Sequence, residues 1–234
     1  MGTPNSAWRG EGKRARGYAG PAMLNRYARA FFTKVFTPLA RLLLRLGISP
    51  DVVTVVGTLG VCFGALFFFP RGELFWGVIV ITAFVFSDTI DGVMARLQGR
   101  QGVWGAYLDS TLDRFGDAAV FAGLTIWFFR GGDHVVTACL ALACLVLGSL
   151  VSYAKARAEG VGLSADVGIA ERADRLVSTL VTTGLVGLGL PQVVLTVVLA
   201  LLAVASAITV VQRMGTVRRQ AFAAVDGSLP ATRG

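Results

Sequence analysis

Four aspartates with helical spacing are the residues of this sequence best suited to chemistry. Asp88 and Asp91 are three positions apart and Asp109 and Asp113 are four apart, so each pair projects from one face of a helix. Four negative charges close together repel one another unless cations or protons bind between them. An all-oxygen cluster without His or Cys selects a hard ion, so we expect Mg²⁺ or Mn²⁺. Two such ions are the usual clamp for displacement at a phosphoryl group.

A fifth aspartate, Asp117, follows one helical turn after Asp113, but Arg114 lies three residues before it. Residues at this spacing are neighbours on a helix surface, so we expect Asp117 to be neutralised locally by Arg114. The other four are the functional candidates, since the second span offers only Arg96 nearby.

The segments that carry these aspartates are predicted to cross a membrane. The 234 residues are 54% hydrophobic and only 15% charged, with a mean hydropathy of +0.66, which excludes an ordinary water-soluble enzyme. About 20 helical residues span the hydrocarbon core of a bilayer, and carboxylates within such a span are functional candidates by default. We therefore expect an all-α polytopic membrane protein with six transmembrane helices, at about 50–69, 74–96, 103–129, 135–157, 172–190 and 192–213.

A short amphipathic helix at about 38–46 is predicted to precede the first span and to lie in the membrane interface, with leucines on one face and arginines on the other. Thr37 and Pro38 have the residue types of its N-cap and first position, and Gly47 those of its end. Ser49 and Pro50 repeat the start signal for the first span. The expected organisation is one membrane domain, 31–215, between a flexible basic tail, 1–30, and a flexible C-terminal tail, 216–234.

The distribution of positive charge predicts the orientation. The net charge is +8, and 19 of the 22 Lys and Arg residues fall in the two terminal segments and the loops after the second and fourth spans, whereas Arg71 and Arg130 lie at the opposite face. Because cytoplasmic segments are rich in Lys and Arg, we expect both termini and the aspartates to face the cytoplasm, in the cell membrane. Basic residues on so apolar a chain indicate the lipid bilayer, and not nucleic acid, as the partner.

The aspartates belong to a longer pattern that spans residues 88–113: DTIDGVMAR, eight residues, then GAYLDSTLD. It resembles the signature DxxDGxxAR(x8)GxxxDxxxD of the CDP-alcohol phosphotransferases. This resemblance implies transfer of a phosphatidyl group from CDP-diacylglycerol to an alcohol with release of CMP, and a homodimer. It also implies that Asp88, Asp91 and Asp109 are ligands of two divalent ions, and that Asp113 is both a ligand and the general base.

Small residues of this pattern have a physical role of their own. Gly92, Ala95 and Gly105 would let a nucleotide lie against the helix backbone, although tight helix packing is the alternative explanation. The resemblance implies that Arg96 pairs with the diphosphate. It also implies that Asp51 and Thr54 face the nucleotide from the first span, where capping and topology offer an equal explanation.

Basic residues on the same predicted face are candidates for binding the acceptor. The runs SYAKARAE, residues 152–159, and ERADR, residues 171–175, are similar to the phosphatidylinositol phosphate synthases of this family, which implies inositol 1-phosphate as acceptor. A phosphorylated acceptor needs cations, and Arg provides bidentate recognition of phosphate. The candidates are Ser152, Lys155, Arg157, Arg175 and, less directly, Arg213, while the positive-inside rule alone explains any one of these bases equally well.

Other functions stay open from the sequence. Glycerol 3-phosphate presents the same phosphate to the same bases, so a phosphatidylglycerol phosphate synthase is the main alternative. A cation transporter also uses aspartates within the membrane, but such sites tend to lie at the bilayer midplane between repeats, and this chain has its aspartates near one surface and no visible repeat.

Overall fold

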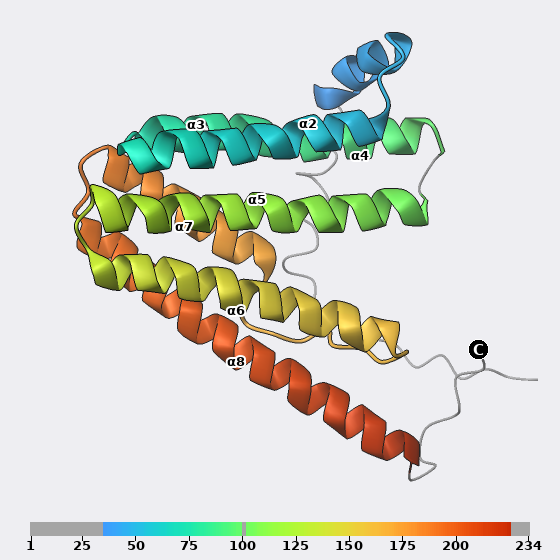
Figure 1. Cartoon of the computed structure of the whole chain (residues 1–234). Coiled ribbons are helices and arrows are strands. Elements are labelled where there is room, and N and C mark those ends of the chain that lie inside the picture. The colour runs from blue at the N-terminus through green and yellow to red at the C-terminus, as the bar shows by residue number, and fades with distance from the viewer. Residues whose placement is uncertain (1–34, 100–101, 226–234) are drawn as a thin grey trace, which may run out of the picture.

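The computed structural model describes residues 35–99 and 102–225, and helices account for most of them (Figure 1). A helix over residues 35–45 comes first and lies against one end of the bundle. The predicted all-α class is confirmed. The labelled helices are α2 (Pro50–Phe63), α3 (Leu74–Val85), α4 (Ser87–Leu97), α5 (Val103–Arg130), α6 (Val135–Gly160), α7 (Arg172–Gly187) and α8 (Gln192–Val225).

Four helical segments within the described ranges are long and apolar enough to cross a membrane: Pro50–Arg71, Leu74–Leu97, Val135–Gly160 and Gln192–Ala223. These segments make the chain a membrane protein. The other two predicted spans correspond to α5, which carries four charged residues within its first 15, and to α7, which has 16 residues. A count of six spans therefore remains a prediction, although α5 and α7 run alongside the other helices (Figure 1).

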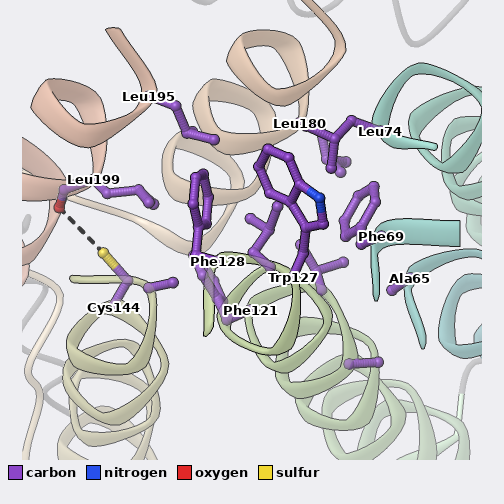
Figure 2. Close-up of a cluster of buried hydrophobic side chains, with 14 of the residues drawn as sticks. Ala65, Phe69, Leu74, Phe121, Trp127, Phe128, Cys144, Leu180, Leu195 and Leu199 are labelled. Atoms are coloured by element: carbon purple, nitrogen blue, oxygen red, sulfur yellow. Dashed lines mark hydrogen bonds between the residues drawn. The ribbon is translucent and has the colours of Figure 1, made fainter. Parts of the chain in front are cut away.

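The helices pack around a core at one end of the bundle. α2 contacts α3, α4 and α5, α6 contacts α5 and α8, and α7 contacts α3 and α8. Large buried side chains from these helices meet near the turns that follow α2 and α5, including Phe69, Trp127, Phe128, Leu195 and Leu199 (Figure 2). Burial of this apolar cluster fixes the helices at one end and leaves their polar ends, which carry the aspartates, at the other.

The start of α2 is the one predicted. The Ser49 side chain accepts a hydrogen bond from the Val52 N–H at 3.4 Å, and Pro50 occupies the first helical position. Gly47, with φ +78°, ends the preceding helix in the left-handed conformation that glycine favours. The predicted start of that preceding helix is wrong, because the helix already runs through Thr37 and Pro38, so neither residue caps it.

The predicted continuous span 74–96 is two helices that meet at Phe86. The Ser87 hydroxyl donates a hydrogen bond to the Phe84 carbonyl at 2.6 Å, a side-chain bond of the kind that bends helices. Beyond the break, α4 lies so close to α2 that a Cβ on Gly57 would be 1.9 Å from the Ser87 Oγ. The break and this close approach bring the polar residues of α4 against α2.

The helix ends also differ from the prediction. α2 gives way to a π-helical turn, Gly64–Phe68, and a 3₁₀ turn, Phe69–Arg71, before the chain reverses. α8 continues to Val225, well past the predicted end at 213, so helix covers the first ten residues of the segment expected to be a flexible tail. The predicted tail at 1–30 lies outside the described residues.

Candidate active site

A cavity of about 820 Å³ opens between the start of α2, α4 and the start of α5. All six residues predicted to bind the CDP-linked lipid line it, together with two of the predicted metal ligands, Asp91 and Asp109. The six are Asp51, Thr54, Gly92, Ala95, Arg96 and Gly105. Residues that are spread over 59 positions of sequence therefore meet at one site.

Two hydrogen bonds tie the walls of this cavity together. The Thr54 hydroxyl lies 2.5 Å from the Asp91 Oδ2, and both side chains are buried between α2 and α4. The indole N–H of Trp104 donates to the Asp51 Oδ2 at 3.0 Å and so joins α5 to α2. Both bonds hold a carboxylate at a fixed place on the cavity wall, which is the kind of preorganisation that an active site needs.

The predicted glycines face open space. A Cβ built on Gly105 would meet nothing within 4 Å, and one on Gly92 would meet only the Arg96 guanidinium, at 3.7 Å. Gly57, Gly123 and other helical glycines behave differently, since a Cβ there would collide with a neighbouring helix. Tight packing thus explains those glycines, whereas Gly92 and Gly105 leave the cavity wall free for a ligand.

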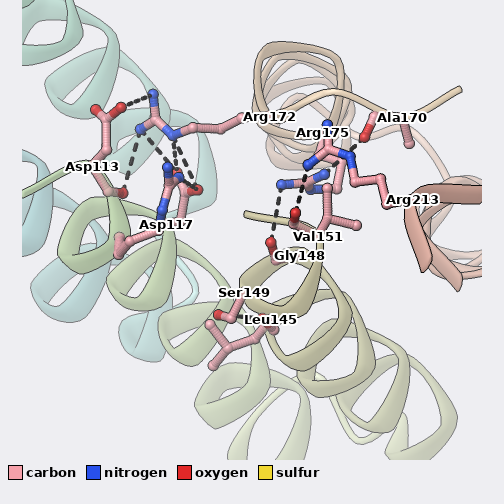
Figure 3. A network of polar contacts seen from close by, with 11 residues as sticks. Asp113, Asp117, Leu145, Gly148, Ser149, Val151, Ala170, Arg172, Arg175 and Arg213 are labelled. Carbon is pink, nitrogen blue, oxygen red and sulfur yellow. Dashed lines mark hydrogen bonds and ion pairs between the residues drawn. The ribbon is translucent and has the colours of Figure 1, made fainter. Parts of the chain in front are cut away.

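Asp113 and Asp117 share one arginine, Arg172 at the start of α7 (Figure 3). The Arg172 Nη1 lies 3.0 Å from the Asp113 Oδ2, and its Nη2 and Nε lie 3.0 and 3.1 Å from the Asp117 Oδ1. The expected local pair of Arg114 with Asp117 is present as well, at 3.8 Å. Asp113 therefore borders a small separate pocket with Arg172, and not the main cavity.

The structure brings together only part of the predicted carboxylate cluster. Among the described residues, no group of three or more His, Cys, Asp or Glu side chains is arranged to hold a metal ion. The Asp88 side chain lies outside the described residues. Asp91 and Asp109 nevertheless line the same cavity, whereas Asp113 borders the pocket with Arg172.

Lys155, a predicted acceptor residue, lies at the polar end of α6. Its Nζ is 2.5 Å from the Asp166 Oδ1 and 4.0 Å from the Glu159 Oε1. Hydrogen bonds from Lys155 and then from Ser164 lower the pKa of Asp166 below its ordinary value. The loop that connects α6 to α7 thus supplies the anion that Lys155 binds in this structure.

Arg175 and Arg213, two further acceptor candidates, are 2% and 6% exposed and donate to backbone carbonyls (Figure 3). Arg175 donates to Ala170 at 2.9 Å and to Gly148 at 3.4 Å. Arg213 donates to Val167 at 2.9 Å and to Val151 at 2.5 Å. Both guanidinium groups therefore hold the α6–α7 loop against α6 and α8.

The last two acceptor candidates, Ser152 and Arg157, lie on different sides of α6. Ser152 is half-buried on α6 three residues before Lys155, on the same side of the helix. Arg157 is exposed and lines a different groove, between α6 and α8, from which Lys155 is absent. Two positions on a helix differ by about 200°, so Lys155 and Arg157 face opposite ways.

Comparison with known proteins places this geometry in a family. Residues 47–209 match the CDP-alcohol phosphatidyltransferase family, a range that contains every residue of the cavity. The chain belongs to this family. It is 53% identical over 226 residues to the phosphatidylinositol phosphate synthase of Streptomyces avermitilis, covering 94% of this chain and 91% of that one. It is 48% identical over 193 residues to the enzyme of the same name from Mycolicibacterium smegmatis, covering 81% and 86%.

Two crystal structures of a family member have the same fold. The phosphatidylinositol phosphate synthase of Mycobacterium tuberculosis with CDP-DAG bound is 45% identical and superposes with a TM-score of 0.76, covering 79% of this chain and 94% of that one. The same enzyme in complex with manganese and citrate gives a TM-score of 0.73, with coverage of 78% and 88%. The chain is therefore an enzyme, a CDP-alcohol phosphatidyltransferase.

Three residues of the site were missed by reasoning from the sequence. Trp104 directly precedes Gly105 of the motif. An indole N–H away from water needs a polar partner, and this requirement could have pointed to a polar contact of Trp104. Arg172 lies in the ERADR run one helical turn before Arg175, yet its partners are more than 50 residues away. Asp166 lies in a loop, where no helical spacing relates it to Lys155.

Proposed function

We propose that this enzyme transfers the phosphatidyl group of CDP-diacylglycerol to inositol 1-phosphate, giving phosphatidylinositol phosphate and CMP. The observation that carries the proposal is the single cavity lined by all six residues predicted for the CDP-linked lipid and by Asp91 and Asp109. The 53% identity to a phosphatidylinositol phosphate synthase over nearly the whole chain supports the choice of acceptor.

The CDP moiety would lie in the cavity between α2, α4 and α5. Gly92, Ala95 and Gly105 leave the helix backbones accessible there, so the flat ring and ribose can approach closely. Arg96, exposed at the end of α4, would pair with the diphosphate. From α2, Thr54 and Asp51 would position the nucleotide and the carboxylates around it.

Divalent ions fit the donor set of this site. The carboxylates of Asp91 and Asp109 offer only oxygen ligands, and no His or Cys is among the described residues that line the cavity, a combination that suits Mg²⁺ and Mn²⁺. We assign two ions to Asp88, Asp91, Asp109 and Asp113. When bound, they would neutralise charge on the diphosphate and on the departing CMP.

Asp113 is proposed as the general base. The acceptor hydroxyl oxygen forms a bond to the phosphorus of the phosphatidyl group, the bond from that phosphorus to the CMP oxygen breaks, and Asp113 takes the hydroxyl proton. Arg172, 3.0 Å from its Oδ2, orients this carboxylate. Asp117, on the same guanidinium, holds Arg172 in place for that task.

The acceptor phosphate would be bound by Lys155, Arg175 and Arg213, with Ser152 as a hydrogen-bond partner. These residues surround the α6–α7 loop, at the same end of the bundle as the aspartates (Figure 1). The phosphate would replace the Asp166 carboxylate on Lys155 and take up further N–H groups of the two arginines. Arg157 faces away from this group, so its role as an acceptor ligand remains a prediction only.

The membrane arrangement is part of the proposal. We place six spans in the cell membrane, with the cavity, the acceptor residues and both termini on the cytoplasmic side, on the basis of the positive charge at that end. We also expect a homodimer. A reporter fused after Gly234 should be cytoplasmic, and the loop near Arg71 should be labelled only from outside.

The deciding experiment offers a panel of alcohols to the purified enzyme with CDP-diacylglycerol and identifies the lipid product. Inositol 1-phosphate should give the highest kcat/KM, with free inositol far lower because it lacks the phosphate that the basic residues bind. A higher kcat/KM for glycerol 3-phosphate would contradict the acceptor and leave phosphatidyl transfer intact. Release of CMP distinguishes all these reactions from cation transport.

A further inference from the structure

A second large groove lies between α6 and α8, outside the proposed reaction site. Its volume is about 510 Å³, and most of its lining is apolar, including Leu150, Tyr153, Val210, Met214 and Val217. Several of these side chains are strongly exposed, among them Tyr153 at 65% and Met214 at 63%. A groove with such walls on an outward-facing helix pair is open to lipid.

Two arginines line the polar end of this groove, Arg157 on α6 and Arg218 on α8. Within residues 35–99 and 102–225, neither guanidinium has a carboxylate within 4.0 Å, and no Asp or Glu lines the groove. Arg218 stacks over the Phe222 ring at 5.6 Å. Arg213 also borders the groove, but its bonds to Val151 and Val167 hold it in the helix contact.

We place the two arginines at the depth of lipid headgroups from their distances along the helices, taking each helix to start at the opposite edge of the hydrocarbon core. At about 1.5 Å per residue, Arg157 is about 33 Å along α6 from Val135, and Arg218 is about 39 Å along α8 from Gln192. The hydrocarbon core of a bilayer is about 30 Å thick, and about 40–45 Å with headgroups. Leu150, only about 22 Å along α6, stays within the hydrocarbon. The groove thus runs from acyl-chain depth to phosphate depth.

We infer that this groove is a binding site for an anionic phospholipid, with an acyl chain along the apolar wall and the phosphate between Arg157 and Arg218. A free phosphate would gain nothing from an apolar wall, and a zwitterionic lipid brings its own ammonium group, which offsets the charge that its phosphate offers to the two arginines. The site goes beyond the proposed function: of the residues placed in the proposed reaction, only Arg213 borders the groove, and Asp91, Asp109 and Lys155 do not.

The test measures lipid binding by the full-length protein in detergent, by native mass spectrometry, without substrates. Phosphatidylglycerol should be retained more strongly than phosphatidylcholine with the same acyl chains, because only phosphatidylglycerol has a net negative charge. The double variant Arg157→Gln with Arg218→Gln should lose at least tenfold in affinity for phosphatidylglycerol. The control is Arg219→Gln, which removes one positive charge from the position next to Arg218 on α8, outside the groove, and should retain binding.

A second variant probes the apolar wall without touching charge. Ala154→Trp should fill the groove and weaken phosphatidylglycerol binding to a similar degree, and circular dichroism and the Tm without lipid verify folding of each variant. Unchanged binding by both the double variant and Ala154→Trp would overturn the inference. Displacement of the lipid by inorganic phosphate or inositol 1-phosphate would also overturn it. If Ala154→Trp abolished the dimer and left lipid binding intact, the groove would instead be an interface between two copies of the chain. Because no turnover is measured, failure here is distinct from failure of the proposed reaction.

Discussion

The two polar regions of this enzyme differ in whether their charges already have partners. In the cavity between α2, α4 and α5, neither Asp91 nor Asp109 has a Lys or Arg nitrogen within 4.0 Å among the described residues. Around α6, α7 and α8, by contrast, Arg172, Arg175 and Arg213 all bond to oxygens of the protein itself. The first region has negative charge left over for cations. The second has positive charge that already bonds to the protein, so a ligand there competes with existing partners.

This difference predicts different energetic roles for the two regions. A site with unneutralised carboxylates binds metal strongly, because binding relieves repulsion. A site whose cations are already hydrogen-bonded gains only the difference between the new and the old partners. The metal and base residues should therefore control turnover, and the basic residues should adjust acceptor affinity.

The largest effect should come from removing the metal. EDTA is expected to abolish CMP release, because the carboxylates cannot replace the charge that the ions supply at the diphosphate. Added Mg²⁺ or Mn²⁺ should restore the activity. Turnover that persists in EDTA, with no metal detected in the protein, would contradict the claim that the carboxylates of the cavity serve to bind cations.

Replacing the base should have the next largest effect. Asp113→Asn is expected to reduce kcat by about 10²- to 10⁴-fold, the usual contribution of a positioned general base. CDP-lipid binding should change little, because the cavity residues remain. Asp117→Asn is the matched variant: it leaves Arg172 bonded to Asp113 and should lose clearly less activity. Equal losses in the two variants would move Asp117 into the reaction itself.

Filling the cavity should separate binding from stability. Gly105→Leu is expected to raise the KM for CDP-diacylglycerol at least tenfold, because the side chain enters open space that the nucleotide needs. The same change should raise the Tm, since glycine within a helix costs about 1 kcal/mol relative to better helix formers. Gly215→Leu, on α8 with nothing within 4 Å of a Cβ, should raise the Tm without changing KM. A lower Tm for Gly105→Leu would mean that this glycine serves packing after all.

The smallest effects should appear at Lys155 and its partner Asp166, where two substitutions should change the KM for inositol 1-phosphate in opposite directions. Lys155→Gln is expected to raise the KM for inositol 1-phosphate about tenfold, the lower end for loss of a charge-assisted hydrogen bond, because the side chain is 43% exposed. Asp166→Asn removes the competing anion and should lower that KM, by about two- to fivefold. Because the pKa of Asp166 is lowered, the carboxylate stays ionised and competes throughout the neutral range, and stops competing only in strong acid. If the two variants changed KM in the same direction, Lys155 would not bind the acceptor.

Reasoning from the sequence was most successful where residues follow each other along a helix. The pattern over 88–113 placed Asp91, Gly92, Ala95, Arg96, Gly105 and Asp109 on one cavity because period 3.6 and the length of a hairpin determine their relative positions. The break at Phe86 escaped prediction, since it depends on one serine hydroxyl and a nearby glycine on another helix. The partners of Arg172 and Lys155 escaped too, because they depend on how α7 and a loop dock, which no local period encodes.

The break between α3 and α4 gives a residue far from the chemistry control over the site. α3 is anchored in the apolar core through Leu74 and Ile81, whereas α4 carries Asp91. A single methyl group on Gly57 would force either the Ser87 hydroxyl to leave the Phe84 carbonyl or α4 to move away from α2. Because α2 also carries Thr54, that movement would disturb the hydrogen bond from the Thr54 hydroxyl to Asp91. Gly57 is thus a mutational weak point of this enzyme, a position without any functional group whose smallest replacement disturbs the active site.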